Sequence, residues 1–407
     1  MNVIFVEPSF PSNQQEFPRA LSEAGATVIG IGEFPKESLP GDLRHQLRHY
    51  EQIRSVVDED ALTDAVRRVQ KHAQVHRLEA TVEAHILAAA NVREACGIPG
   101  TSVRTAFLCR DKPSMKEVLR EGGVPCADST AASSGEEVRE FVARVGFPVI
   151  VKPRAAAGAS GTFRADDPAE LEAVIIDCGV ESGHSVAIEE YIEGHEGFYD
   201  TITIDGRIVH DFACHYYPNV LEAMRTRWIS PQFITTNRLD SAPAYEEVKE
   251  MGRRVVELLG IETSATHMEW FFGPKGLKFS EIGCRPPGVG CWDLYSAGNE
   301  MDIYSEWAHA VVHGQPKQFP TRRYSAGIIA LRPSQDGNID GYEGVEIINR
   351  AFGEWIIDVH LPRVGTPTQP VSAGYMANAW VRMRHPDYDT LREMLDEVGR
   401  TLKVRAV

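Results

Sequence analysis

The chain has 407 residues, of which 43% are hydrophobic and 25% are charged, and its formal net charge at pH 7 is −16. The length predicts roughly two to four packed units, and the acidic balance argues against a nucleic-acid-binding protein, whose binding face is usually basic. The N-terminal residues lack the basic region and cleavage site of a signal peptide, and no apolar run is long enough to span a membrane. The seven scattered cysteines form no C-x-x-C pair, which predicts reduced thiols in a cytoplasmic protein.

Strands and helices alternate in the first part of the chain. The apolar runs NVIFVE and TVIGIG predict two strands, and helical patterns lie between and after them. This order is typical of a parallel sheet covered by helices. We therefore predict an α/β domain at about 1–105, with strands at 2–7 and 27–32 and helices at 13–24, 59–78 and 83–96.

The next part of the chain mixes both kinds of element. A helix is predicted at 113–120, because Asp111 can cap its start and Gly122-Gly123 can end it. The other predicted elements are helices at 135–145, 167–178 and 243–260, strands at 147–153, 185–192 and 199–209 with a hairpin turn at Asp205-Gly206, an irregular stretch at 210–240, and, after Gly314, short strands with one late helix at 387–402.

The segment HMEWFFGPKGLKFSEIGCRPPG, residues 267–288, predicts a hairpin with an acid on each arm. A three-residue loop at 274–276 suits a type I turn followed by a left-handed glycine. Glu269 then falls opposite Glu281, and directly opposed like charges destabilise a sheet. A divalent cation with oxygen ligands, most naturally Mg²⁺, would relieve this repulsion.

Two further features bear on this hairpin. The alternative is that both acids are solvated on an outer face, but the flanking aromatic residues indicate a buried hairpin. Arg285 follows as a fixed positive charge whose fork suits phosphate or carboxylate oxygens. The neighbouring Cys284 is interpreted as a small buried thiol.

Lys152 ends an apolar strand and is followed by the small-residue loop RAAAGASGT at 154–162. Small side chains let backbone N–H groups approach an anion, and a lysine neutralises its charge. The loop has neither the Walker spacing nor the dinucleotide-binding fingerprint, so a mobile surface turn is the alternative. The segment EEYIEGHE at 189–196 combines acids with an apolar strand and a glycine. These acids either take part in the site or are solvated at the edge of a strand.

The order of these segments resembles the ATP-grasp superfamily. It runs through Asp111-Lys112, FPVIVKP, the small-residue loop, EEYIEG and Glu269-x11-Glu281-x3-Arg285. The resemblance reaches from the N-terminus to about residue 315 and implies a multidomain α/β and α+β protein. Its expected parts are a Rossmann-like pre-ATP-grasp domain at 1–105, a small lid subdomain at 106–185, a nucleotide- and metal-binding subdomain at 186–315, and a small C-terminal α+β unit at 316–407.

The resemblance also implies a role for each matching residue. Lys112 and Lys152 would bind ATP, and Arg285 would steady the transferred phosphate. Glu269 and Glu281 would hold Mg²⁺, with Mn²⁺ as an alternative. The other ATP-binding residues would be Gly158, Ala159, Ser160 and Gly161 of the phosphate loop, Glu189, Glu190, Tyr191 and Ile192 of the adenine hinge, and Glu196 at the ribose.

One position departs from the family pattern. The family usually has Glu-x-Asn before the arginine, whereas Gly283 offers no side-chain ligand. This leaves one metal site intact and puts a second metal in doubt.

The implied activity is ATP-dependent ligation, in which a substrate carboxylate becomes an acyl phosphate and an amine displaces the phosphate. The phrase SATHMEWFF is similar to the branch of bacterial L-amino-acid ligases. This implies small carboxylate and amine substrates, no nucleic-acid or membrane partner, and a homodimer as one assembly. Three residues are candidates for substrate contact: His267, Arg225 and Arg227. The alternative for His267 is a histidine of the core, and the alternative for the two arginines is an exposed basic loop. The alternatives are a bicarbonate-activating enzyme of the biotin-carboxylase or carbamoyl-phosphate type, and an ATP-binding regulatory protein without turnover.

Overall fold

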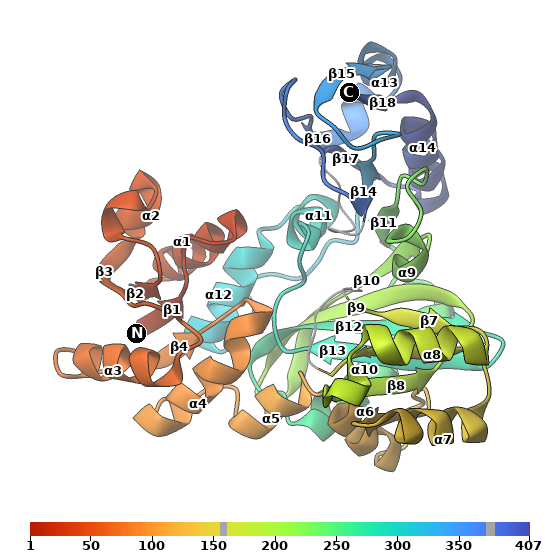
Figure 1. The fold of residues 1–407 in the computed structure, drawn as a ribbon. Helices are drawn as coiled ribbons and strands as arrows, with labels where there is room; N and C mark the ends of the chain where they lie inside the picture. The colour runs from red at the N-terminus through yellow and green to blue at the C-terminus, as the bar shows by residue number, and fades with distance from the viewer. Residues whose placement is uncertain (155–160, 372–378) are drawn as a thin grey trace.

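The computed structural model describes residues 1–154, 161–371 and 379–407. These residues form an N-terminal parallel sheet, a small antiparallel sheet and one long antiparallel sheet, together with a two-stranded sheet near the C-terminus (Figure 1). In Figure 1 the N-terminal elements lie on the left, the small sheet lies at the lower right, and the C-terminal elements lie at the top. The predicted mixed architecture of α/β and α+β parts is confirmed.

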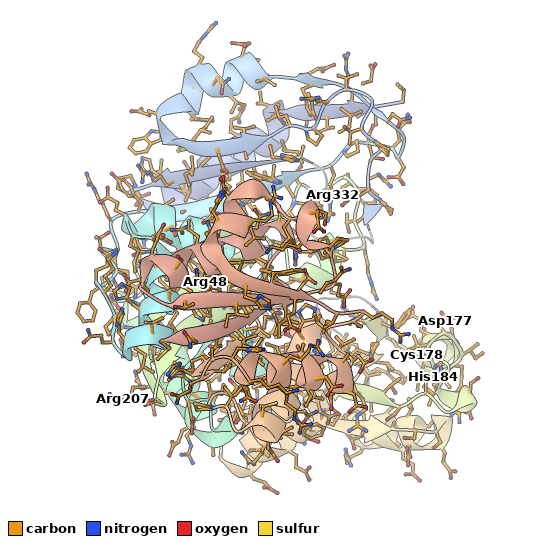
Figure 2. The ribbon with its side chains drawn as sticks, turned by 90° about the vertical axis from the view of Figure 1, so that its left-hand side faces the viewer. Arg48, Asp177, Cys178, His184, Arg207 and Arg332 are labelled. Carbon is orange, nitrogen blue, oxygen red and sulfur yellow. The ribbon has the colours of Figure 1, made fainter. Side chains whose placement is uncertain are left out.

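The N-terminal sheet is parallel, with strand order β3-β2-β1-β4, and Figure 2 labels Arg48 on its edge strand. Its two central strands are almost fully buried because helices cover them. The helix predicted at 59–78 was too long, since α3 ends at Gln70 and residues 77–79 pair with β1 as β4. The elements are β1 (Asn2–Val6), η1 (Ser12–Gln15), α1 (Glu16–Glu23), β2 (Thr27–Gly32), η2 (Lys36–Ser38), α2 (Gly41–Gln46), β3 (Leu47–Gln52), α3 (Glu59–Gln70), β4 (Arg77–Glu79), η3 (Glu83–His85), α4 (Ile86–Cys96) and α5 (Val103–Leu108).

The small sheet has strand order β5-β8-β6-β7 and is antiparallel throughout. The helix before it begins as predicted, because the Asp111 side chain accepts a hydrogen bond from Ser114 N at 3.1 Å. Its elements are α6 (Lys112–Glu121), β5 (Ser129–Ala132), α7 (Gly135–Val145), β6 (Val149–Pro153), β7 (Phe163–Ala165), α8 (Pro168–Asp177), η4 (Val180–Ser182) and β8 (Val186–Glu190).

The long sheet has strand order β13-β12-β9-β10-β11-β14-β17-β16. The prediction of an irregular stretch at 210–240 was wrong, since β10 continues to Tyr217 and β11 follows. Polar residues obscured β10 in the sequence, and one of them, His210, is buried against Glu306 of α12 at 3.0 Å. The elements of this part are β9 (His195–Ile204), β10 (Arg207–Tyr217), α9 (Val220–Ala223), β11 (Gln232–Thr235), η5 (Pro243–Tyr245), α10 (Glu246–Leu259), β12 (Ser264–Gly273), β13 (Gly276–Gly283), α11 (Cys291–Asn299) and α12 (Ile303–His313).

The C-terminal part shares the long sheet with the part before it. Strand β14 pairs with β11 on one side and with β17 on the other, so the sheet crosses the boundary predicted at 315. The domain limits remain a prediction. The late helix is confirmed as α14, but the prediction of a single helix here missed α13. The elements are β14 (Ser325–Leu331), β15 (Ile339–Glu343), α13 (Val345–Phe352), η6 (Gly353–Trp355), β16 (Ile356–His360), β17 (Ala379–His385), α14 (Tyr388–Thr401) and β18 (Lys403–Ala406).

The core consists of several buried clusters on both faces of the long sheet and within the other two sheets. All seven cysteines lie in the described residues and are unpaired, as predicted. Within the described ranges, no helix combines the length and the apolar character that crossing a membrane requires.

Candidate active site

The two glutamates of the predicted hairpin face each other across β12 and β13. Glu269 is the register partner of Glu281, which the sequence predicted. The predicted three-residue loop is wrong, because Gly273 pairs with Gly276 and leaves a two-residue turn. The resulting shift of register is reversed by a bulge next to Glu269, where Ser280 has no register partner. The opposition of the two acids therefore depends on this bulge.

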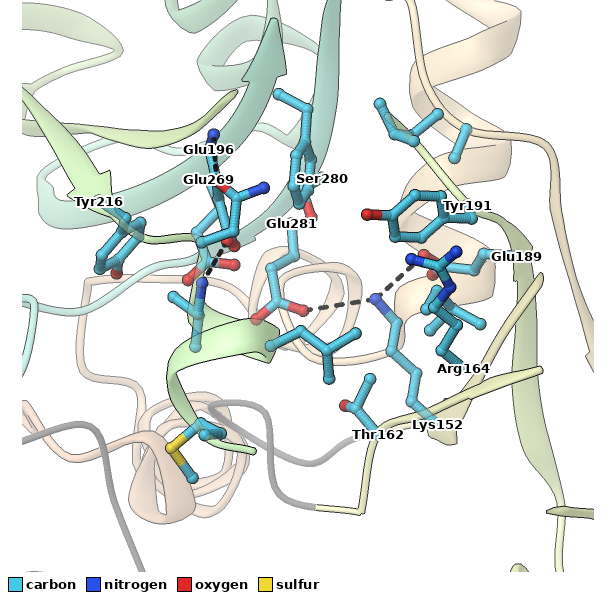
Figure 3. Close-up of a pocket in the computed structure, with 18 of the residues that line it drawn as sticks. Lys152, Thr162, Arg164, Glu189, Tyr191, Glu196, Tyr216, Glu269, Ser280 and Glu281 are labelled. Carbon is cyan, nitrogen blue, oxygen red and sulfur yellow. Dashed lines mark hydrogen bonds and ion pairs between the residues drawn. The ribbon is translucent and has the colours of Figure 1, made fainter. Parts of the chain in front are cut away.

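Both glutamates line a cavity of about 660 Å³ between the small sheet and the long sheet (Figure 3). Lys152 and Glu189 reach it from β6 and β8, and Glu196 reaches it from β9. The fold thus gathers side chains from five strands and two sheets around one space.

Buried ammonium groups form one side of this cavity. Lys152 Nζ lies 3.0 Å from Glu189 Oε2 and 3.9 Å from Glu281 Oε2. Lys116 Nζ lies 2.7 Å from Glu189 Oε2, and Lys112 Nζ lies 3.2 Å from Glu281 Oε2. Burial would raise the pKa of Glu189, but Lys116 and Lys152 outweigh it and lower this pKa to about 2. Burial would likewise lower the pKa of Lys152, yet Glu189 and Glu281 raise it. The lysines are suited to neutralise phosphate groups.

The opposite side of the cavity holds closely spaced acidic side chains. Glu196 is 6% exposed, and burial followed by the charge of Glu269 raises its pKa to about 8. Carboxylate oxygens that repel one another in this way fit a hard divalent cation such as Mg²⁺. Glu269 and Glu281 would hold the ion, with phosphate oxygens and water as further ligands. Among the described residues, no group of three or more His, Cys, Asp or Glu side chains forms a metal site by itself.

A histidine next to these acids carries a positive charge. His267 Nδ1 lies 2.7 Å from Asp200 Oδ1, and its Nε2 lies 3.6 Å from Glu269 Oε1. Burial would lower the pKa of His267, but Asp200 outweighs it and raises this pKa to about 9. Tyr295 of α11 donates a hydrogen bond to the other oxygen of Asp200. Asp200 therefore keeps the ring charged and fixes its orientation.

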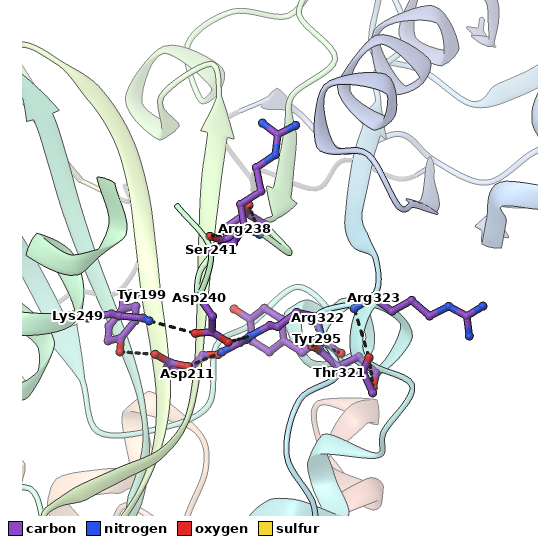
Figure 4. Close-up of polar contacts among 12 residues, drawn as sticks. Tyr199, Asp211, Arg238, Asp240, Ser241, Lys249, Tyr295, Thr321, Arg322 and Arg323 are labelled. Atoms are coloured by element: carbon purple, nitrogen blue, oxygen red, sulfur yellow. Dashed lines mark hydrogen bonds and ion pairs between the residues drawn. The ribbon is translucent and has the colours of Figure 1, made fainter. Parts of the chain in front are cut away.

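Contacts further along the sheet hold the strands that carry these residues (Figure 4). Tyr199 Oη donates to Asp211 Oδ2 at 2.8 Å, which ties β9 to β10. Arg322 donates to Asp211 O at 2.7 Å and to Asp240 Oδ2 at 3.0 Å. Because Tyr199 precedes Asp200 in the chain, these contacts stabilise the strand on which Asp200 stands.

Arg285 lies where this cavity meets a second one. Its Nε lies 2.8 Å from Glu83 Oε2 of the N-terminal part. Arg285, Gly288 and Val289 line both the first cavity and a second cavity of about 840 Å³, which lies between the N-terminal part and helices α11 and α12. A Cβ atom at Gly283 would stand 3.0 Å from Glu83 Oε2. Glycine at this position therefore leaves room for the Glu83–Arg285 pair.

Comparison with known proteins supports the resemblance to the ATP-grasp superfamily. Residues 111–205 match the model of the carbamoyl-phosphate synthase L chain, ATP binding domain. The chain is 27% identical over 324 residues to the L-arginine-specific L-amino acid ligase of Bacillus subtilis. This match covers 78% of this chain and 76% of the relative. An L-amino acid ligase from Bacillus licheniformis has a crystal structure of the same fold, with a TM-score of 0.76, 17% identity, and coverage of 100% of this chain and 98% of the other. This chain is similar to ATP-grasp proteins of the carboxylate–amine ligase branch.

A second solved structure of the same fold contains bound ligands. It is the biotin carboxylase domain dimer of 2-oxoglutarate carboxylase from Hydrogenobacter thermophilus, in complex with MgADP, ADP and bicarbonate. Its TM-score is 0.70 at 18% identity, and the match covers 99% of this chain and 90% of the other. That protein binds a magnesium–nucleotide in the fold that this chain shares.

The predicted adenine hinge, residues 189–192, lies along the first cavity. Residues 189–192 all line it, and Ile192 is 8% exposed. The ring of Tyr191 lies under the Arg164 guanidinium, 4.2 Å from the ring centroid. Glu190 pairs with Lys275 of the hairpin turn at 2.9 Å, which joins the two sheets at the rim. The assignment of this segment to adenine stays a prediction.

The other predicted residues differ in where they lie. Gly158, Ala159 and Ser160 fall outside the described residues, whereas Gly161 is described and has a left-handed φ of 68°. His267 and Arg225 line the cavity with the nucleotide-binding candidates. Arg227 pairs instead with Asp336 of the C-terminal part, away from the lining that the described residues form. We therefore retain Arg225 and not Arg227 as a candidate for substrate contact.

Three residues of the site were not predicted. Lys116 follows Lys112 by four residues, so both lie on one face of α6, and this spacing was an available signal. Asp200 and Glu83 gave no local signal, because their partners Tyr295 and Arg285 are distant in the sequence.

Proposed function

We propose that this chain is an ATP-dependent ligase that converts the carboxylate of an amino acid into an acyl phosphate and joins it to the amine of a second substrate. One observation carries the proposal. Glu269 and Glu281 are opposed in a cavity where Lys112 and Lys152 approach the same Glu281 carboxylate. Acids for a divalent cation beside ammonium groups for phosphates are what a metal–nucleotide requires.

The first step is phosphoryl transfer. A carboxylate oxygen of the donor substrate attacks the γ-phosphorus of ATP, and ADP leaves. Lys112 and Lys152 neutralise the phosphates, and Arg285 stabilises the transferred group. Bound Mg²⁺ would supply further neutralisation of phosphate charge.

The second step forms the amide bond. The amine nitrogen attacks the acyl carbon, the C–O bond to the phosphate breaks, phosphate leaves with the bonding electrons, and the nitrogen loses a proton. Since both steps depend on positioning and electrostatic stabilisation, no side-chain nucleophile is needed. The second cavity shares Arg285 with the first, so we assign it to the approach of the amine.

Arg225 is the candidate for binding the donor carboxylate. It lines the cavity, and among the described residues it forms no ion pair. The other cationic groups of the lining are each held by an acid. These pairs are Lys116 and Lys152 with Glu189, Arg164 with Asp166, His267 with Asp200, and Arg285 with Glu83.

A substrate screen tests the proposal. Purified protein is mixed with ATP, Mg²⁺ and pairs of L-amino acids, while phosphate release is followed and products are analysed by mass spectrometry. We expect amino-acid-dependent ADP and phosphate release and a product whose mass equals the two substrates less one water. Turnover that depends on bicarbonate instead, or nucleotide binding without turnover in any mixture, would contradict it.

A further inference from the structure

Arg225 lies in a segment that forms one wall of the first cavity, and this segment is held at both ends. This wall segment is residues 219–226, which contain the short helix α9. It contributes Asn219, Val220, Leu221, Glu222, Met224 and Arg225 to the cavity lining.

The start of the wall segment is tied to β9. Asn219 Oδ1 accepts a hydrogen bond from Glu196 N at 3.0 Å, and Asn219 Nδ2 donates to Gly194 O at 2.8 Å. Glu196 Oε2 accepts from Val220 N at 2.7 Å. This end therefore moves with the strand that carries Glu196.

The other end of the wall segment is held by the C-terminal part. Arg332 follows β14, and its Nη1 donates to Ala223 O and, at 3.1 Å, to Thr226 O. Figure 2 labels its side chain. The last carbonyls of a helix have no partner within the helix, so an arginine is well suited to bind them. The two acceptors lie on either side of Arg225 in the chain, and one guanidinium thus fixes the backbone that carries it.

We propose that Arg332 is a positioning residue for the donor carboxylate, because it holds the wall segment so that Arg225 faces the cavity. This inference rests on the proposed function of Arg225. Arg332 does not line the cavity formed by the described residues, so its effect would pass through the wall segment. The C-terminal part would thereby take part in substrate binding without touching the substrate.

The chain offers a matched control. Arg227 and Asp336 form an ion pair between the same two parts of the chain, and the Asp336 side chain is 50% exposed. Asp336→Asn removes the negative charge of this pair and leaves Arg332 and its two carbonyl acceptors in place. We expect it to change neither the wall segment nor substrate binding.

The first test needs no substrate. Hydrogen–deuterium exchange of the full chain is compared for the wild type, Arg332→Ala, Arg332→Lys and Asp336→Asn. We expect the amides of 220–226 to exchange about tenfold faster in Arg332→Ala, less so in Arg332→Lys, and unchanged in Asp336→Asn. Unchanged exchange in Arg332→Ala would overturn the inference.

The second test is a double-mutant cycle with the amino acid that the wild type turns over fastest. We expect Arg332→Ala to raise the KM for this donor about tenfold and to change kcat less than about threefold. In the Arg225→Ala background the same substitution should add little, because its effect passes through Arg225. Additive effects, or a loss of kcat without a change in KM, would show that Arg332 is only structural. A wild type that turns over no amino acid would refute the proposed function, while the exchange result would still decide whether Arg332 holds the wall segment.

Discussion

Replacing Lys152 by methionine removes the cation that lies between Glu189 and Glu281 in the first cavity. Its side chain is 11% exposed, and its ammonium nitrogen lies 3.0 Å from Glu189 Oε2 and 3.9 Å from Glu281 Oε2. Methionine keeps the length of the side chain and removes only the charge and its hydrogen bonds. We expect Lys152→Met to weaken the binding of a magnesium–ATP analogue.

The expected loss follows from the contact that disappears. A hydrogen bond between charged groups contributes about 1.5–3 kcal/mol, so the Kd should rise about 10- to 150-fold. Lys112 remains 3.2 Å from Glu281 and Lys116 remains 2.7 Å from Glu189, so neither acid is left without a cation. The fold should therefore persist, and Lys152→Arg, which keeps the charge, should lose less affinity.

Calorimetric titration with Mg²⁺ and a non-hydrolysable ATP analogue measures this Kd. Lys275→Met is the matched control, because Lys275 also borders the site and pairs with Glu190 at 2.9 Å, but its side chain is 69% exposed. An exposed pair contributes about 0–1 kcal/mol, so this Kd should change less than about fivefold. If Lys152→Met bound the analogue within about threefold of the wild type, with an unchanged melting curve, the assignment of Lys152 to phosphate would be refuted.

Three further predictions follow from the site. Glu281→Gln should abolish ADP release while the melting curve persists, and an active variant would remove the metal assignment. Asp200→Asn should lower the pKa of His267 from about 9, since burial remains and the largest cause that raises this pKa is removed; NMR titration measures it, and an unchanged pKa would contradict the pairing. Because the folded-state pKa of His267 is raised, its contribution to wild-type stability is complete below pH 6.5 and is lost as the pH rises through 9, a decline that Asp200→Asn should reduce. Gly273→Ala would place a Cβ atom 2.0 Å from Glu193 O, next to the predicted hinge, and should weaken analogue binding. Gly353→Ala, whose Cβ would have no atom within 4 Å, should leave analogue binding unchanged.

The hairpin shows how far the sequence could predict the site. The opposition of Glu269 and Glu281 was predicted correctly, but from a loop one residue too long. The bulge at Ser280 compensated for this difference. A bulge is a local distortion of pairing with no clear signal in an alternating pattern, so the register could not be derived from the sequence alone.

Neighbouring arginines show a second limit. Arg225 and Arg227 stand two residues apart in one basic stretch, and no feature of the sequence distinguishes them. Their environments differ because Asp336, from a distant part of the chain, pairs with only one of them. Partners of this kind are set by tertiary packing.

Strand β10 was missed for a related reason. Its polar residues break the expected alternation of apolar and polar side chains, and His210 is polar yet 2% exposed. Its Nε2 lies 3.0 Å from Glu306 Oε2 of α12, across the core. Lys116, in contrast, could have been predicted, because its spacing from Lys112 places both on the same face of a helix.

The central claim is that Glu269 and Glu281 hold a divalent cation against the phosphates of ATP. A crystal grown with Mn²⁺ and a non-hydrolysable ATP analogue tests it directly, since anomalous scattering locates the metal. We expect a peak within bonding distance of both carboxylates and of phosphate oxygens, with Lys152 also at the phosphates. A peak elsewhere, with Glu269 still paired with His267 and Glu281 still paired with Lys112 and Lys152, would contradict it.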